Sequence, residues 1–109
     1  MKLYLTSDHA GFALKQTLVR HLQDRGLHVQ DLGPASLNET DDYPDIIFPF
    51  AKKVAEDRDA RGSVFGGSGQ GEAMVANKVR GIRAAVYYGG SFDIVRLSRQ
   101  HNDANVLAL

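Results

Sequence analysis

The chain has 109 residues, of which 43% are hydrophobic and 24% charged, and this composition is typical of one globular domain. Thirteen basic residues balance thirteen acidic ones, so the basic surface of a nucleic-acid-binding protein is missing and a small-molecule partner is favoured. The absence of cysteine excludes disulfides, thiolate metal sites and thiol nucleophiles. Because neither a signal peptide nor an apolar run of membrane-spanning length is seen, we expect a cytoplasmic protein without a membrane partner.

Short β-rich segments alternate with helical patterns along the chain. In the first helical pattern, Leu14, Leu18 and Leu22 recur every four residues and predict one packed face, with Gly26 as the stop signal. A second helix is predicted to begin near Pro44, which is tolerated in a first turn. The third and fourth helices are expected at 71–78 and 91–100. The strands are expected at 2–6, 27–32, 62–65, 83–87 and 105–109.

This alternation predicts a single α/β domain over residues 1–109, with a parallel sheet covered by helices on both faces. In such sheets ligands bind beyond the carboxyl ends of the strands, where the connecting loops begin. The loop sequences therefore become the candidates for a functional site.

The first candidate loop follows strand 2–6 and contains Asp8 and His9. A carboxylate and an imidazole would therefore lie at the carboxyl end of a strand. Capping of the following helix is the commonest role of an aspartate at such a place, and it is the alternative interpretation here.

The strongest signal is the glycine-rich loop Gly66–Gly71, with Ser68 and Gln70 between its glycines and Glu72 after it. Four glycines within six residues allow a ligand to approach the backbone closely, and a helix N-terminus offers unpaired N–H donors to negative charge. A tight turn followed by a glutamate in the first turn of a helix is the structural alternative. Because four glycines exceed what a turn needs, we favour a functional role.

Three familiar glycine motifs do not fit this loop. A P-loop requires Lys and Ser or Thr after its last glycine, whereas Glu72 and Ala73 follow here. A nucleophile elbow requires a glycine two residues after its serine, where this chain has Gln70. A dinucleotide fingerprint belongs after the first strand. The remaining interpretation is an oxyanion-stabilising loop beside a general base, Glu72.

The last candidate cluster, around His101 and Asn102, joins the fourth helix to the final strand. His101 could move protons near neutral pH, or it could only bond to free carbonyls at a helix end, and the sequence leaves both possibilities open. The four histidines lack metal-ligand spacing, so no metal is predicted. Tyr43 could lie against a ligand or belong to a polar loop.

Together these clusters closely resemble the ribose-5-phosphate isomerase B family, which includes the galactose-6-phosphate isomerase subunits. The matching stretches are SDHAG at 7–11, DDYPD at 41–45, GGSGQGEAMVANKVRGIRAA at 66–85 and RLSRQHNDANVLAL at 96–109. The resemblance implies a Rossmann-like three-layer αβα sandwich with a five-stranded parallel sheet. It also implies a homodimer, or a higher oligomer, whose active sites draw residues from both subunits.

The same resemblance implies cofactor-free isomerisation of a sugar phosphate through an enediolate. Some relatives place a catalytic cysteine at the position of Gly66, whereas this chain resembles the branch with a glutamate base at Glu72. His101 would open the sugar ring with help from Asp8, and Asn102 would hold the substrate. Further roles are implied for Ser68 and for the backbone of Gly67, Gly69, Gln70 and Gly71 in stabilising the enediolate, and for His9 and Tyr43 in lining the pocket.

Two departures from the family pattern bear on the substrate. Relatives continue beyond the position of Leu109 with a helical segment whose arginines bind the substrate phosphate, and the stretch Tyr87–Ser91 looks about two residues longer than usual. Ribose 5-phosphate is the first expectation, with allose or galactose 6-phosphate behind it. A non-catalytic sugar-phosphate-binding or regulatory protein on the same scaffold is the alternative function.

Overall fold

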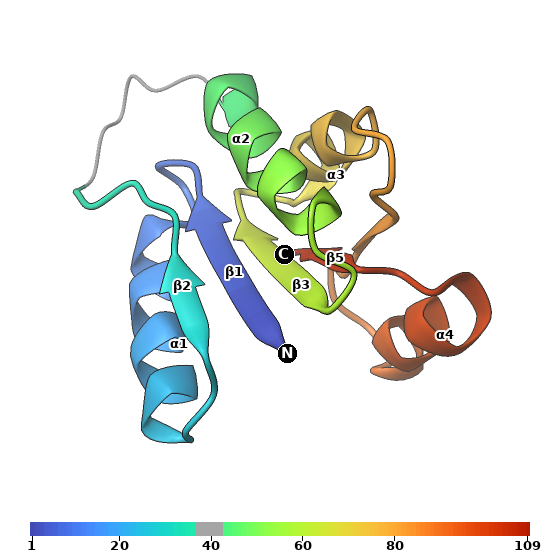
Figure 1. Ribbon diagram of the computed structural model, residues 1–109, viewed down its shortest axis with the longest axis horizontal. Helices are drawn as coiled ribbons and strands as arrows, with labels where there is room; N and C mark the ends of the chain where they lie inside the picture. Colours follow the sequence, from blue (N-terminus) through green and yellow to red (C-terminus); the bar gives the residue numbers. More distant parts are fainter. Residues whose placement is uncertain (37–42) are drawn as a thin grey trace.

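The computed structural model describes residues 1–36 and 43–109. Strands and helices alternate as the sequence predicts, and every strand pair is parallel (Figure 1). The order of the strands across the sheet is β2-β1-β3-β5-β4, so the predicted five-stranded parallel sheet is confirmed. The elements are β1 (Lys2–Ser7), α1 (Phe12–Asp24), β2 (Val29–Asp31), α2 (Tyr43–Ala55), β3 (Ala60–Phe65), α3 (Gln70–Ala76), β4 (Ala84–Val86), α4 (Asp93–Asn102) and β5 (Val106–Ala108).

One face of the sheet carries α2 and α3 and holds the main hydrophobic core (Figure 1). Ile47, Phe50 and Val54 of α2 are fully buried there, each contributing about 1.5–3 kcal/mol of transfer free energy. The Phe50 ring packs so closely on β3 that a Cβ at Gly62 would lie 2.4 Å from it. The glycine therefore lets helix α2 settle onto the centre of the sheet.

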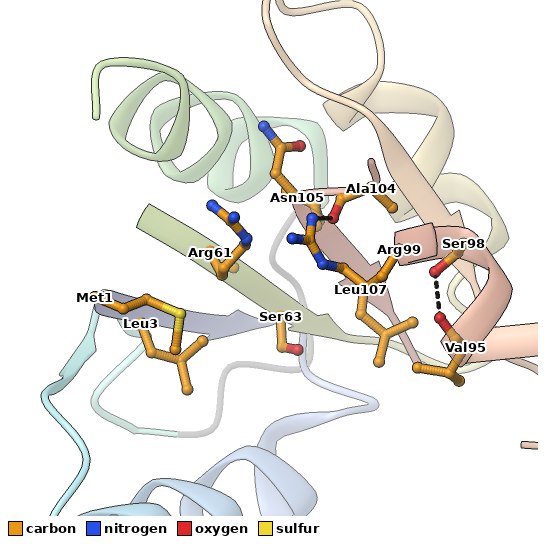
Figure 2. A pocket seen from close by; sticks show the side chains of 12 residues that line it. Met1, Leu3, Arg61, Ser63, Val95, Ser98, Arg99, Ala104, Asn105 and Leu107 are labelled. Atoms are coloured by element: carbon orange, nitrogen blue, oxygen red, sulfur yellow. Dashed lines mark hydrogen bonds between the residues drawn. The ribbon is translucent and has the colours of Figure 1, made fainter. Parts of the chain in front are cut away.

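The opposite face carries α1 and α4, which completes the expected αβα sandwich. Beside α4 the sheet is left with a groove of about 290 Å³, whose floor includes Leu3, Ser63 and Leu107. Figure 2 shows the Arg61 and Arg99 side chains at this groove, with Asn105 beside them.

Helix α1 packs differently from the prediction. Leu14, expected on the packed face, is 49% exposed, whereas Lys15 is fully buried. The Lys15 ammonium donates to Asp31 Oδ1 at 2.9 Å and to the Pro34 carbonyl at 2.7 Å, so its charge is balanced inside the fold. The hydrophobic pattern missed this because the ion pair joins two segments far apart in the chain.

The remaining differences concern boundaries. Helix α3 ends at Ala76, two residues before the predicted end. Helix α4 begins at Asp93, because Ser91 stays outside the helix and its Oγ accepts a hydrogen bond from the Asp93 amide at 3.1 Å. None of the helices in the described part of the chain is long and apolar enough to span a membrane.

Candidate active site

Two of the candidate loops meet at the carboxyl edge of the sheet. The amide of Asp8 donates to the Phe65 carbonyl at 3.1 Å, and the amide of Gly66 donates to the Leu109 carbonyl at 2.8 Å. A Cβ at Gly67 would find Ala10 of the first loop 3.9 Å away. The loop after β1, the loop after β3 and the end of β5 therefore form one continuous edge.

The Asp8 side chain is 8% exposed and is held at its base by the start of α1. Its Oδ1 accepts a hydrogen bond from the Gly11 amide at 3.0 Å. Gly11 must be a glycine, because a Cβ there would lie 2.2 Å from the Phe65 carbonyl oxygen. Gly11, and not Asp8, is the N-cap of α1, so the capping interpretation of Asp8 is wrong, but the hydrogen bond from the Gly11 amide fixes the Asp8 carboxyl group at the carboxyl edge.

Glu72 lies in the first turn of α3 and is 4% exposed. Its carboxyl group occupies the space beside the Gly66 α-carbon, where an added Cβ would lie 1.8 Å from Oε1. The side chain therefore folds back over the loop instead of extending into solvent. Its position explains why residue 66 is a glycine in this chain.

Asp8 and Glu72 form a buried pair of carboxyl groups. Burial raises the pKa of Glu72 to about 7, and the hydrogen bond to Asp8 and the negative charge of Asp8 act in the same direction. Desolvation is the largest of these causes, so the neutral form of Glu72 persists to a higher pH than it would in an exposed glutamate. An acid with such a pKa can both accept and release a proton at neutral pH.

The glycine loop runs from Gly66, beside the Glu72 carboxyl group, to the first turn of α3. Gly69, the N-cap of α3, has φ +79°, and a Cβ there would lie 3.0 Å from the Ala108 carbonyl carbon. The loop is therefore pressed against the end of β5 in a conformation that favours glycine. Ser68 Oγ accepts a hydrogen bond from the Gln70 amide at 3.3 Å, which leaves its hydroxyl hydrogen able to donate.

The remaining predicted residues of this edge are less deeply placed. His9 is exposed and interacts within the chain, and the Gln70 side chain is exposed. Gly71 follows Gln70 in the first turn of α3 and is partly exposed. Tyr43 begins α2, while its side chain, like Asp41 and Asp42, lies outside the described part of the structure.

His101 and Asn102 lie at the opposite edge of the sheet. They are the last residues of α4, and the chain then enters β5 at Val106 from its amino end. In a parallel α/β fold the helices run back across the sheet, so a helix ends where the next strand begins. One chain therefore does not bring His101 and Asn102 to Glu72.

Sequence reasoning missed the packing role of two glycines in these motifs. Gly66 has no Cβ and so leaves room for the Glu72 carboxyl group, and Gly11 likewise leaves room for the Phe65 backbone at the end of β3. Their presence in the motifs was the available signal, but only the packing shows the neighbour that each one accommodates. Within residues 1–36 and 43–109, no three His, Asp or Glu side chains gather as metal ligands would.

The sequence of this chain is similar to those of known proteins. A sequence profile of the Ribose/Galactose Isomerase family matches residues 3–109. The chain is 42% identical over its full length to ribose-5-phosphate isomerase B of Mycolicibacterium paratuberculosis, of which it covers 67%. It is thus about two thirds as long as that relative.

Solved structures agree in fold. Ribose-5-phosphate isomerase B from Mycoplasma genitalium, with bound ribulose-5-phosphate, is similar with a TM-score of 0.90 and 41% identity, over 97% of this chain and 69% of that one. The Clostridium thermocellum enzyme is similar with a TM-score of 0.87 and 45% identity, over 100% of this chain and 72% of that one. The likeness therefore extends through the sheet, the helices and both edges that carry candidate residues.

Proposed function

The chain belongs to the ribose/galactose isomerase family, and from this we propose that it interconverts ribose 5-phosphate and ribulose 5-phosphate through an enediolate. The relatives named as ribose-5-phosphate isomerase B and the ribulose-5-phosphate-bound neighbour support the choice of substrate. The observation in the chain itself that supports the reaction is the buried Glu72 carboxyl group, with a pKa of about 7, beneath a glycine loop.

In this proposal Glu72 moves the proton. It removes the proton from C2 of the open-chain aldose and returns it to C1 of the enediolate, so the same carboxyl group acts first as base and then as acid. A pKa near 7 suits both steps, because neither the charged nor the neutral form is strongly disfavoured at neutral pH. Burial also keeps bulk water from exchanging the transferred proton.

The glycine loop stabilises the negative charge that builds on the sugar oxygen. The Glu72 carboxyl group packs against Gly66 at the start of this loop, so in this proposal the backbone amides of Gly67–Gly71 supply the donors, and the Ser68 hydroxyl is able to add one. His9 and Tyr43 remain candidates for lining the sugar pocket. Amides suit this task because they do not compete with Glu72 for the proton.

Two chains are needed for the complete set of residues. His101 and Asn102 lie at the amino edge, away from Glu72, so they act in the site of a second subunit. A homodimer that joins the carboxyl edge of one chain to the amino edge of the other brings ring-opening and proton-transfer groups together. Exchange of the same two edges in both directions gives two equivalent sites.

The test is a coupled assay of ribulose 5-phosphate formation with the chain and with its Glu72→Gln variant. Glutamine keeps the size and the polarity of the side chain but cannot accept the proton, so turnover should fall by at least about 100-fold. Far-UV circular dichroism and the melting temperature should show a folded variant. Turnover within a few-fold of the unmodified chain would remove Glu72 as the base.

A further inference from the structure

A polar cavity lies at the amino edge of the sheet, remote from Glu72. It has a volume of about 610 Å³ and lies under the loops that precede β3, β4 and β5. Its lining includes the four arginines Arg58, Arg61, Arg80 and Arg83. The chain as a whole is neutral, so a cluster of four guanidinium groups on one cavity is a local excess of positive charge.

The carboxylates of this cavity do not neutralise that excess. Asp57 and Asp103 are the acidic residues in its lining, against four arginines. Asp57 Oδ1 accepts a hydrogen bond from the Asp59 amide at 2.9 Å, and Asp103 Oδ1 accepts one at 3.1 Å from Arg99, which does not line the cavity. Two positive charges therefore remain in excess around a solvent-accessible space.

The walls of the cavity are held by hydrogen bonds between loops. Asn105 Oδ1 accepts a hydrogen bond from the Arg83 amide at 2.8 Å, and Asn105 Nδ2 donates one to the Gly81 carbonyl at 2.9 Å. Arg61 Nη1 donates to the carbonyls of Arg58 and Ala60 at 3.1 and 2.8 Å. Figure 2 shows the Arg61 side chain rising toward Asn105 at this end of the sheet. Two of the four arginines, Arg61 and Arg83, are thus held in place by hydrogen bonds.

Each guanidinium keeps donors for a ligand. A guanidinium has five N–H donors in a planar fork, and Arg61 and Arg83 each use only one nitrogen on backbone carbonyls within the described residues. Arg58 and Arg80 are exposed, and their guanidinium groups make no hydrogen bond or ion pair with the described part of the chain. Such forks match the oxygens of a phosphate group, with which they form paired charge-assisted hydrogen bonds.

We propose that this arginine cavity binds the phosphate group of a small phosphorylated molecule. The phosphate has two possible sources. Arg83 Nε donates to the Asn102 carbonyl, so the cavity adjoins the residues assigned to a shared site, and the phosphate could be that of the substrate. This first source, the substrate phosphate, rests on the proposed function. The other source is a separate phosphorylated ligand or free phosphate.

The test is titration of inorganic phosphate into the chain and into the double variant Arg58→Gln/Arg80→Gln, by calorimetry at constant ionic strength. The matched control is Arg20→Gln/Arg25→Gln, which removes the same charge from exposed positions around the end of α1. Phosphate affinity should fall at least about tenfold in the cavity variant, because hydrogen bonds to a charged group are lost, and should stay unchanged in the control. Melting temperatures without phosphate verify that all variants fold.

Isomerase kinetics on the same variants identify the source. A raised KM for ribose 5-phosphate with an unchanged kcat assigns the cavity to the substrate phosphate, and unchanged kinetics with lost phosphate binding assign it to a separate ligand. Equal phosphate affinity in all three proteins, or an equal loss in the control, overturns the proposal. Phosphate binding is measured without catalysis. An inactive chain would therefore contradict the isomerase proposal, while the titration would still decide whether the arginine cavity binds phosphate.

Discussion

The carboxyl groups of Asp8 and Glu72 are buried next to each other, an arrangement that costs free energy when both are charged. The fold reduces this cost by two means. The Gly11 amide donates a hydrogen bond to Asp8 Oδ1, and burial favours the neutral form of Glu72. A buried glutamate with a raised pKa is typical of acid–base sites.

This pairing predicts how activity depends on pH. Because Glu72 must be ionised to accept a proton, kcat/KM should rise with pH up to a plateau above about 7, where the carboxyl group is charged. In Asp8→Asn the neighbouring negative charge is gone, so the pKa of Glu72 should fall and the acidic limb should move to lower pH. Burial, the larger cause, remains and keeps the pKa above its ordinary value.

The measurement is kcat/KM from pH 5 to 9 for both proteins. A limb at the same pH in Asp8→Asn, combined with a lower kcat, would mean that Asp8 acts on the sugar and does not tune Glu72.

A second prediction concerns Gly66. Alanine there would place a methyl group 1.8 Å from the present position of Glu72 Oε1, so the carboxyl group must move. A displacement of about 1 Å from the reactive position can cost about 100-fold in rate, and we expect a loss of this size for Gly66→Ala with the fold retained.

The comparison variant is Gly67→Ala, whose Cβ would meet only Ala10 at an ordinary contact distance of 3.9 Å. It should lose much less activity than Gly66→Ala in the same coupled assay. Similar losses in both variants would show that loop flexibility, and not the position of Glu72, governs the rate.

Helix α1 shows how an ion pair can take the place of apolar packing. Lys15 is fully buried against Asp31, whose side chain is 30% exposed, and its ammonium group also donates to the Pro34 carbonyl. Asp31 Oδ1 in turn accepts a hydrogen bond from the Gly33 amide, and Thr6 Oγ1 donates to the Gly33 carbonyl. The ion pair therefore ties α1 to β2 and to the carboxyl end of β1, just before Asp8.

Lys15→Met should consequently destabilise the fold. Removing one partner of a buried pair costs 3–5 kcal/mol, and since Asp31 is partly solvated we expect the low end, roughly 3 kcal/mol of unfolding free energy. Urea denaturation monitored by circular dichroism measures it. Lys53→Met on the exposed face of α2 removes the same charge and should change the unfolding free energy by less than about 0.5 kcal/mol. Equal effects in both would contradict a structural role for the Lys15 pair.

The complete fold separates the candidate catalytic residues onto two edges of one sheet. Glu72 and Asp8 lie at the carboxyl edge, and His101 and Asn102 lie at the amino edge with the arginine cavity. A monomer with these residues in two places cannot perform ring opening and proton transfer on one bound sugar. In the proposed homodimer the carboxyl edge of each chain would face the amino edge of its partner, and the two sets of residues would then meet.

Subunit complementation tests this arrangement. Glu72→Gln and His101→Ala should each be nearly inactive alone, whereas an equimolar mixture, unfolded and refolded together, should regain about a quarter of full activity. Half of the dimers are then mixed, and one of the two sites in each mixed dimer has both intact residues. Activity that stays at the level of the separate variants would show that both residues act within the same chain.

The sequence alone determined the alternation of strands and helices, the parallel sheet and the chemistry-bearing loops, because hydrophobic periodicity and glycine placement are local properties. It also identified Asp8 and Glu72 as candidates. Only the tertiary structure decided that these two acids touch, that Lys15 is buried, that His101 lies at the other edge and that four arginines share a cavity. These facts depend on which distant segments pack together, and on the direction in which each helix returns across the sheet, neither of which a local pattern encodes.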